Sequence, residues 1–245
     1  MKLKQLLFAS AISVAICTQT AMAQTPRWLD PQVNRVNTEK SRSSFFAYES
    51  ESLAKKGVKE ESNRFLSMEG TWKFRFCKDH NLAPKNFFLP DYDDTLWDDF
   101  PVPGLFEMNG YGDKIYKNVG YAWATQFASN PPHVEEKNNY TGSYRRTFNI
   151  PAQWKGDRIY VHVGSATSNL TLWVNGKEVG YSEDSKLAAE FDITKYVVPG
   201  QKATIAMQVM RWCDGSYGED QDFWRFTGIA REVYMYARPA AHIQD

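Results

Sequence analysis

Asn169-Leu-Thr-Leu-Trp-Val-Asn-Gly-Lys-Glu-Val-Gly-Tyr-Ser182 decides the fold of this chain. Two strand-like runs, residues 169–174 and 177–182, are separated by the dipeptide Asn175-Gly176. A two-residue type I′ turn needs a positive φ at both central positions, and Asn-Gly meets that need best. The stretch therefore predicts a β-hairpin.

Similar short runs lie on both sides of this hairpin. In residues 68–76, Trp72, Phe74 and Phe76 alternate with polar residues, which is the pattern of a half-buried strand. Further strand-like runs cover residues 97–102, 143–148, 158–163, 203–210 and 230–236. Turn residues separate the runs, and no convincing long amphipathic helix interrupts them. The order predicts an all-β fold, a β-sandwich whose strands cross between two sheets.

Length and charge limit the classes of function. The chain has 245 residues, of which 42% are hydrophobic, so it can bury one substantial core. Lys plus Arg and Asp plus Glu both number 29, so no positive excess points to nucleic acid or an anionic membrane surface. Motifs for a serine hydrolase, a P-loop or a dinucleotide site are missing from the sequence, as is zinc-ligand spacing. A neutral polar ligand fits better.

Residues 1–23 have the pattern of a secretory signal peptide. Lys2 and Lys4 precede the apolar run 6–16, and Ala21-Met-Ala23 offers small residues for cleavage before Gln24. The apolar run is shorter than the ~20 residues that a membrane span needs. A lipoprotein is the alternative, but Ile16 stands before Cys17 where a small residue is expected. We expect a periplasmic or secreted protein.

Residues 24–63 form a polar, non-periodic stretch, which we expect to be an N-terminal arm on the surface of a domain at 64–245. A helical turn is expected near residues 53–56. The run Phe45-Phe-Ala-Tyr48 is too aromatic to stay in water, so part of the arm should dock. Cys77 and Cys213 would be the remaining cysteines after cleavage; one bridge is possible, but two small buried thiols are expected.

The run Arg211-Trp-Cys-Asp-Gly-Ser-Tyr-Gly-Glu-Asp-Gln-Asp-Phe-Trp-Arg225 concentrates acids, an amide and aromatic rings. Such a mixture suits a sugar, because an aromatic ring can lie against the apolar face of a pyranose while carboxylate and amide oxygens accept hydrogen bonds from its hydroxyls. The alternative is a solvated acidic turn whose aromatic residues belong to the core.

Taken together, the chain resembles the N-terminal sugar-binding domain of glycoside hydrolase family 2, most closely that of lacZ-type β-galactosidases. The matching segments are Asn34-Arg35, Glu69-Gly-Thr-Trp72, Pro103, Met108-Asn-Gly-Tyr111, Ile115-Tyr-Lys-Asn118, Asn139-Tyr-Thr-Gly142, residues 172–181, Asp184-Ser-Lys186, Glu190-Phe-Asp192 and the run 211–225. The resemblance covers nearly everything after residue 23. It is specific, because Asp-Gly-Ser-Tyr-x-Glu-Asp-Gln-Asp-x-Trp-Arg is not a generic pattern.

This resemblance implies a jelly-roll β-sandwich of the galactose-binding-domain-like class. In the family, immunoglobulin-like domains and a (β/α)₈ barrel with the catalytic glutamates follow this domain, and the barrel hydrolyses terminal β-galactosides with retention. We expect this chain to be a fragment that lacks the barrel and is inactive alone. The full-length relatives form homo-oligomers.

The resemblance assigns two substrate-binding residues, Asn139 and Asp222. Asn139 matches the asparagine that reaches the galactosyl ring, and Asp222 matches the aspartate that contacts the sugar and helps to hold sodium, in a site shared with the barrel. Tyr140 stands where the relatives carry proline, which could loosen this loop. For Asn139 the alternative is a simple turn, and for Asp222 it is a structural pair with Arg225 or Arg211.

Three further residues, Glu219, Asp220 and Trp224, are possible supports of the site; Trp224 could equally belong to the core or to an interface, as could Tyr217. Magnesium is used by the family elsewhere in its longer chains, and the sequence offers no cluster for it here. The predicted function is galactoside binding for a β-galactosidase. The alternatives are a stand-alone lectin-like module, or the same domain of a β-glucuronidase or β-mannosidase.

Overall fold

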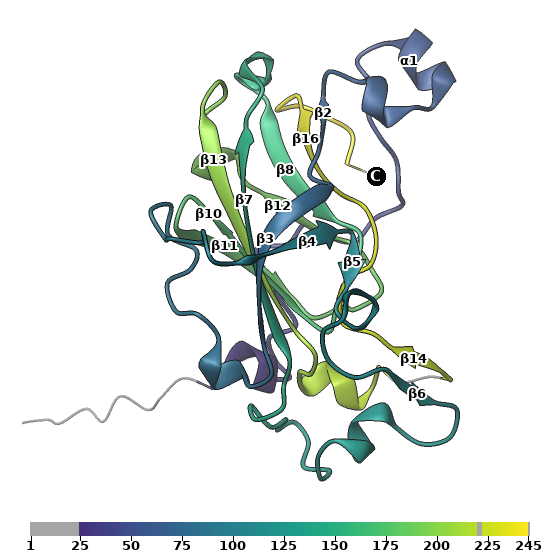
Figure 1. Cartoon of the computed structure of the whole chain (residues 1–245). Coiled ribbons are helices and arrows are strands. Elements are labelled where there is room, and N and C mark those ends of the chain that lie inside the picture. Colours follow the sequence, from purple (N-terminus) through teal and green to yellow (C-terminus); the bar gives the residue numbers. More distant parts are fainter. Residues whose placement is uncertain (1–24, 220–221, 245) are drawn as a thin grey trace, which may run out of the picture.

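The structure, a computed structural model, describes residues 25–219 and 222–244. Strands dominate it, and its one α-helix within those residues, α1 (Glu51–Lys56), stands apart from the sheets (Figure 1). The prediction of a mostly β fold is therefore confirmed. The predicted signal peptide lies outside the described residues. No helix in the described part of the chain combines the length and apolarity that a bilayer crossing requires.

Two antiparallel sheets make up the body of the domain. The larger has the order β1 (Arg35–Val36), β11 (Lys177–Ser182), β10 (Leu170–Val174), β13 (Lys202–Met210), β7 (Thr141–Asn149), β3 (Gly70–Cys77), β4 (Asp98–Val102). The smaller has the order β12 (Ala189–Asp192), β8 (Arg158–Val163), β16 (Val233–Arg238), β2 (Phe65–Ser67). Neighbours such as β13 and β10 are distant in sequence, so strands cross between the sheets.

Short elements close the ends of the sandwich. They are the pair β14 (Phe223–Arg225) and β6 (Ile115–Lys117), and the trio β5 (Gly104–Leu105), β15 (Gly228–Ile229) and β9 (Ala166–Thr167). Single 3₁₀ turns occur at Arg27–Leu29, Lys59–Glu61, His80–Leu82, Glu107–Asn109, Ala122–Thr125, Ala152–Trp154, Thr194–Tyr196 and Asp214–Tyr217. The pair β6 and β14 lies at the end of the molecule opposite α1 (Figure 1).

The main core lies between the two sheets. Trp72 and Phe74 of β3 are buried together with Met207 of β13 from the larger sheet, and they meet Val161 of β8 and Met235 of β16 from the smaller one. Each such side chain contributes about 1.5–3 kcal/mol by leaving water. The predicted alternation in β3 stops before Phe76, which is only partly buried.

The predicted hairpin is present. β10 pairs with β11, and Asn175 and Gly176 have φ of 50° and 80°, as a type I′ turn requires. The Asn175 side chain also holds the turn: its Nδ2 donates to the Tyr196 carbonyl at 2.8 Å, and its Oδ1 accepts from the Thr204 amide at 2.9 Å. One residue therefore supplies both the turn geometry and its attachment to the next strands.

The N-terminal arm is docked on both sheets. β1 pairs with β11 as an edge strand, and Thr38 bridges Phe191 of β12. Helix α1, which includes the expected turn at 53–56, begins after the cap Ser50 and ends at Gly57 with φ of 69°. Phe46 packs against a group of tyrosines on the smaller sheet. The expectation that the aromatic part of the arm docks is confirmed.

Both cysteines in the described residues are free. Cys213 is buried, as expected, and belongs to a second apolar cluster near the β6 end of the sandwich with Trp28, Trp123 and Trp212. Cys77 differs from the expectation, because it ends β3 at the surface and is only partly buried. The second cluster supports the segment that carries the candidate site.

Candidate functional site

The segment 211–225 begins where β13 ends and returns as β14. Its first residues are held by the loop at Asn139 and Tyr140: the Arg211 amide donates to the Tyr140 carbonyl at 2.8 Å. Trp212 is 1% exposed, so the start of the segment is buried. The acidic and aromatic residues further along are thereby placed at the end of the sandwich.

Asn139 is completely buried. Its Nδ2 donates to the Trp212 carbonyl at 2.9 Å, and its Oδ1 accepts from the Trp212 amide at 2.9 Å. The amide thus ties two loops together as a peptide group would, and in this structure both of its polar atoms are used within the protein. Sugar contact by Asn139 stays a prediction; what the geometry gives is a loop anchor.

Tyr140, which stands where the resemblance expects proline, is buried beside Asn139. Its side chain is 2% exposed, its hydroxyl donates to Asp113 Oδ2 at 2.6 Å, and the Arg211 guanidinium lies 4.8 Å from its ring centroid. Burial, followed by the bond to Asp113, raises the pKa of Tyr140 to about 12. A looser loop in the absence of proline stays a prediction; the structure gives a buried, hydrogen-bonded ring at this position.

Asp222 lies exposed at the start of β14. The Tyr116 hydroxyl of β6 donates to its Oδ1 at 2.8 Å, and this bond is the main cause of a raised pKa for Tyr116. Among the described residues no ion pair joins Asp222 to Arg225 or Arg211. The alternative role for Asp222, a structural ion pair with one of these arginines, is therefore not observed.

Trp224 stands beside this carboxylate and is half exposed. It pairs with Tyr116 across the two strands; their ring centroids are 5.4 Å apart, and Phe226 stacks on Trp224 at 5.5 Å and 14°. We call Asp222, Tyr116, Trp224 and Phe226 the aromatic platform. It offers water-facing rings next to an acceptor with room for more hydrogen bonds.

Glu219 attaches the segment to the loop after β11. Its Oε1 accepts from the Ser185 amide at 3.1 Å, and its Oε2 accepts from the Ser185 hydroxyl. Tyr217 packs into the second cluster, with its hydroxyl donating to the His133 carbonyl at 2.6 Å. Asp220 lies outside the described residues. Glu219 therefore supports the segment structurally.

A buried ion pair lies behind the platform. Arg211 and Glu107 both have fully buried side chains, and Arg211 Nη2 lies 3.9 Å from Glu107 Oε1. Glu107 Oε2 accepts from the Thr227 amide at 2.8 Å, which attaches the residues after β14 to the turn at 107–109. Burial raises the pKa of Glu107 and lowers that of Arg211. Arg225 Nη2 donates to the Arg211 carbonyl at 3.0 Å and so extends this support.

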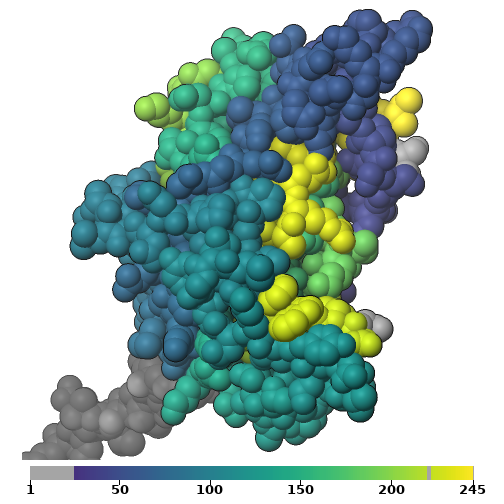
Figure 2. Space-filling view, turned by 45° about the vertical axis from the view of Figure 1, so that its right-hand side comes forward, coloured from purple at the N-terminus to yellow at the C-terminus, as the bar shows by residue number. Residues whose placement is uncertain are grey.

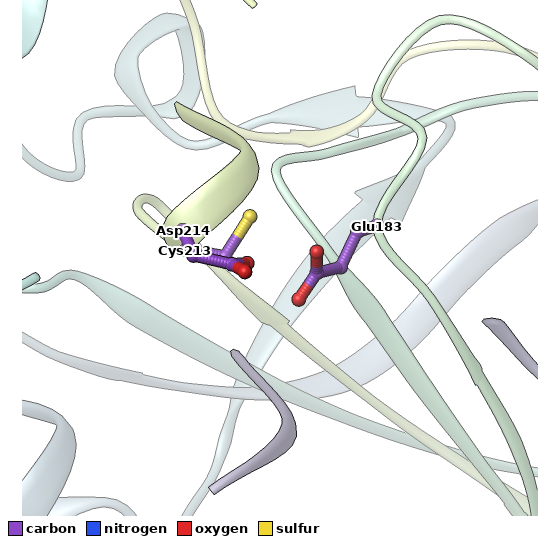
Figure 3. A group of neighbouring side chains, drawn as sticks. All are labelled: Glu183, Cys213 and Asp214. Atoms are coloured by element: carbon purple, nitrogen blue, oxygen red, sulfur yellow. The ribbon is translucent and has the colours of Figure 1, made fainter. Parts of the chain in front are cut away.

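A second carboxylate group was not foreseen from the sequence. Glu183, Cys213 and Asp214 point toward one another (Figure 3), with potential ligand atoms all within 4.8 Å. Burial, together with Asp214, raises the pKa of Glu183 to about 9, so at neutral pH its carboxyl is protonated beside Asp214. Burial also raises the pKa of Cys213 to about 12. Cation binding would require these protons to leave.

These three residues are the donor set in the described chain that could hold a metal ion, whereas the sequence offered no such cluster. Glu183 follows β11 and Asp214 follows β13, which are separated in the sheet by β10. The metal-ligand cluster could therefore be found only from the topology, because both acids follow strands that end at the same side of one sheet. No sequence spacing marks it.

Comparisons with known proteins match both the fold and the sequence. The family model "Glycosyl hydrolases family 2, sugar binding domain" matches residues 65–239. A β-galactosidase of Priestia megaterium is 39% identical over 221 residues, covering 90% of this chain and 21% of that protein. One of Vibrio cholerae is 37% identical over 218 residues, covering 89% and 20%. The chain spans about a fifth of the length of these curated relatives.

Solved structures match the fold. A β-glucuronidase of Bacteroides uniformis superposes with a TM-score of 0.54 at 22% identity, over 72% of this chain and 18% of that one. At this identity the likeness speaks for the architecture of the sandwich alone.

Proposed function

This chain belongs to the family of sugar binding domains of glycosyl hydrolases family 2, and on that premise we propose that it is the sugar-binding domain of a retaining β-galactosidase. In this proposal it positions the galactosyl group of a terminal β-galactoside for a catalytic barrel outside the chain. The similarity to β-galactosidases supports the choice of sugar. The jelly-roll class of the sandwich is part of the same proposal.

The observation that carries this proposal is the aromatic platform. Asp222 accepts one hydrogen bond from Tyr116 and stays open to solvent next to the half-exposed Trp224. A sugar can lay the apolar face of its ring on an aromatic side chain and donate its hydroxyls to the carboxylate. The contacts of Asn139 with Trp212, and of Glu107 with Thr227, hold the platform in place before a substrate arrives.

In this proposal the platform residues position the substrate and take no part in proton transfer. Cleavage with retention needs a nucleophile and an acid/base carboxylate about 5 Å apart, and we assign both to the barrel. Alone, this chain would not hydrolyse a glycoside. Accurate placement of a substrate can account for several kcal/mol of a barrier, so Asp222 matters although it exchanges no proton.

Asp222 is also the residue that would contribute to a sodium site. Its exposed carboxylate and the Tyr116 phenol supply hard oxygen atoms, which suit this cation. Two oxygens are too few for a complete site, so the remaining ligands would come from the barrel and from the sugar. Bound sodium would supply positive charge beside a sugar hydroxyl.

We further propose that the protein is exported, on the strength of the signal-peptide pattern in residues 1–23. Its partners in this proposal are the galactoside, the barrel and the immunoglobulin-like domains of a longer, oligomeric enzyme.

The test uses the longer enzyme that carries this chain. Initial rates are compared for p-nitrophenyl β-D-galactoside, β-D-glucuronide and β-D-mannoside. We expect the galactoside to be cleaved at least tenfold faster than the others. A preference for glucuronide or mannoside would assign the domain to those enzymes instead, and saturable galactose binding by the 245-residue chain alone, lost in Asp222→Ala, would identify a lectin-like module.

A further inference from the structure

A cavity of about 810 Å³ lies between the N-terminal arm and the smaller sheet. Figure 2 shows the arm, in purple and blue, packed beside the yellow C-terminal residues on this side of the molecule. The volume is within the range of about 300–1,000 Å³ that small-molecule sites occupy. We call it the arm cavity; its walls come from residues 39–59 of the arm, from the end of β8, from 186–190 and from 231–234.

The chain's own contacts fix the arm as a wall of this cavity. The Glu39 amide donates to the Glu190 carbonyl at 2.8 Å. Arg42 Nη2 donates to both oxygens of Glu190, at 3.0 and 2.9 Å, and the two side chains are only 8% and 11% exposed. A hydrogen-bonded, largely buried ion pair holds a geometry better than an exposed one does. The cavity is therefore built into the fold.

The acids on the floor of the arm cavity already have partners. Glu190 contacts Arg42 and also His162, whose Nδ1 lies 3.0 Å from Glu190 Oε1. Glu232 forms an ion pair with Lys59. The charges of Glu190 and Glu232 are thus balanced by Arg42 and Lys59.

Positive charge is left over at one end of the cavity. Lys186 and Arg231 adjoin each other, because Arg231 Nη1 donates to the Lys186 carbonyl at 2.7 Å. Lys186 Nζ lies 4.8 Å from the Phe223 ring centroid, a contact that leaves its charge unbalanced, and within the described chain neither Lys186 nor Arg231 forms an ion pair. Partial desolvation lowers the pKa of Lys186, and the charges of Arg225 and Arg231 lower it further. Glu219 acts in the opposite sense, but it is hydrogen bonded to Ser185.

The remaining charges do not cancel this excess. The lining carries a net charge of +2 with His162 neutral, because it has five bases and only three acids. The bases are Lys40, Arg42, Lys59, Lys186 and Arg231, and the acids are Glu39, Glu190 and Glu232. Glu39 is the one acid in the lining without a basic partner there. The pKa of Arg158, raised first by Asp192, and that of Tyr160, raised first by burial, are raised further by its negative charge; both residues lie at the start of β8. Arg231 lies beside Gly164, which follows the other end of that strand, and Arg231 in turn contacts Lys186.

The rest of the wall suits a sugar ring. Leu187 lines the cavity with 53% of its surface exposed, and Ser41 and Ser44 lie among the lining residues. Phe45 is 38% exposed; because the guanidiniums of Arg42 and Arg238 lie 4.7 and 4.9 Å from its ring centroid, it offers a ligand only the part of the ring that they leave uncovered. Exposed apolar surface next to hydroxyl and imidazole groups matches a molecule with one apolar face and several hydroxyls. Tyr234 is less available, because His162 stacks on it at 4.4 Å and Lys59 lies 4.4 Å from its ring centroid.

We propose that the arm cavity binds an acidic saccharide, a sugar ring that carries a carboxylate or a sulfate, with the anion held by Lys186 and Arg231. The guanidinium of Arg231 can bind two oxygens of either anion at once, and Lys186 adds a point charge. The ring lies along the arm against Leu187 and the exposed part of Phe45. This is a second ligand for the domain, in addition to the galactoside of the platform.

Calorimetric titration of the purified chain at low ionic strength tests the proposal. The probes are D-galacturonic acid, D-galactose 6-sulfate, neutral D-galactose and sodium sulfate. The acidic sugars are expected to bind saturably and at least tenfold more tightly than either galactose or inorganic sulfate. The double variant Lys186→Gln/Arg231→Gln should weaken that binding at least tenfold.

A matched control removes the same charge elsewhere. Lys155→Gln/Arg75→Gln replaces one exposed lysine and one exposed arginine outside the cavity, and it should leave the affinity for acidic sugars within twofold. Circular dichroism checks that both double variants are folded. Equal losses in the two variants would reduce the effect to net charge and overturn the proposal.

Other outcomes also decide the matter. Absence of acidic-sugar binding to the folded chain would remove the proposed site, and equal affinity for galactose would remove the role of the anion. Inorganic sulfate binding as tightly as the sulfated sugar would mean a plain anion site without sugar recognition. The galactoside proposal is tested separately, at Asp222: galactose binding that is lost in Asp222→Ala but kept in Lys186→Gln/Arg231→Gln would belong to the aromatic platform and not to the arm cavity.

Discussion

Asn139 binds the backbone of Trp212 with both ends of its amide, donating to the carbonyl and accepting from the amide at 2.9 Å each. The residue that the resemblance assigns to the sugar is therefore the one that fixes the segment leading to Asp222. Positioning of the platform and stability of the domain are coupled at this point.

Asn139→Ala should destabilise the domain by about 2–6 kcal/mol, because two backbone groups of Trp212 lose their buried partners, and each such group costs about 1–3 kcal/mol when left unpaired. Urea unfolding followed by fluorescence measures this loss. The matched control is Asn109→Ala, which removes one exposed bond to the Leu105 carbonyl and should cost under about 1 kcal/mol. Equal, small losses in both variants would mean that Asn139 is not an anchor.

Asp222→Ala should lower kcat/KM for a β-galactoside at least tenfold in the longer enzyme, while the free energy of unfolding of the 245-residue chain changes little, because the side chain is exposed. The control is Asp91→Ala, another exposed acid, placed outside the platform. Unchanged kinetics in Asp222→Ala would exclude the residue from substrate binding.

The bond between Tyr116 and Asp222 can be observed directly. Asp222→Asn should lower the pKa of Tyr116, because the charged acceptor that stabilises the neutral phenol is removed. Ultraviolet difference titration reads this as earlier phenolate absorbance, identified with Tyr116→Phe. A titration curve identical to that of the unmodified chain would show that the two side chains do not meet in solution.

Glu183 gives the domain a distinct dependence on pH. Its pKa is raised to about 9 in the fold by burial, from an ordinary value of 4.5. Between these values the folded state binds a proton that the unfolded state has lost, so stability falls as pH rises, by at most about 1.4 kcal/mol per pH unit. At pH values below 4.5 this contribution is constant.

Glu183→Gln should flatten that dependence, because an amide does not titrate. Urea unfolding at several pH values between 5 and 9 measures the difference, with Glu135→Gln as an exposed control that should leave the slope unchanged. A variant that keeps the full slope would show that another group binds the proton.

Local signals in the sequence were sufficient for the hairpin at Asn175-Gly176, since the turn depends on the conformations that these two residues adopt. They were also sufficient to predict that Phe46 docks, since an apolar ring is partly buried wherever the fold allows it. The partnership of Tyr116 with Asp222 was not predictable in this way, because it depends on the pairing of β6 with β14 across distant parts of the chain.

The buried carboxylates illustrate the same limit more strongly. Glu183 and Asp214 each look like ordinary surface acids in their local sequence, and only the order β11, β10, β13 brings them to one end of a sheet. The type of residue at 139 was equally ambiguous. An asparagine suits a turn, a sugar or a backbone anchor, and its partner in space decides among these.

The anchored turn at Asn175 also affects how the protein ages. An Asn-Gly pair loses ammonia when the glycine nitrogen attacks the side-chain carbonyl, which requires that side chain to swing toward its own backbone. Here both amide atoms of Asn175 are bound to Tyr196 and Thr204, so the folded turn keeps the reacting atoms apart. The folded hairpin should therefore deamidate slowly at this position. Deamidation of Asn175 in a stored sample should mark molecules that have unfolded.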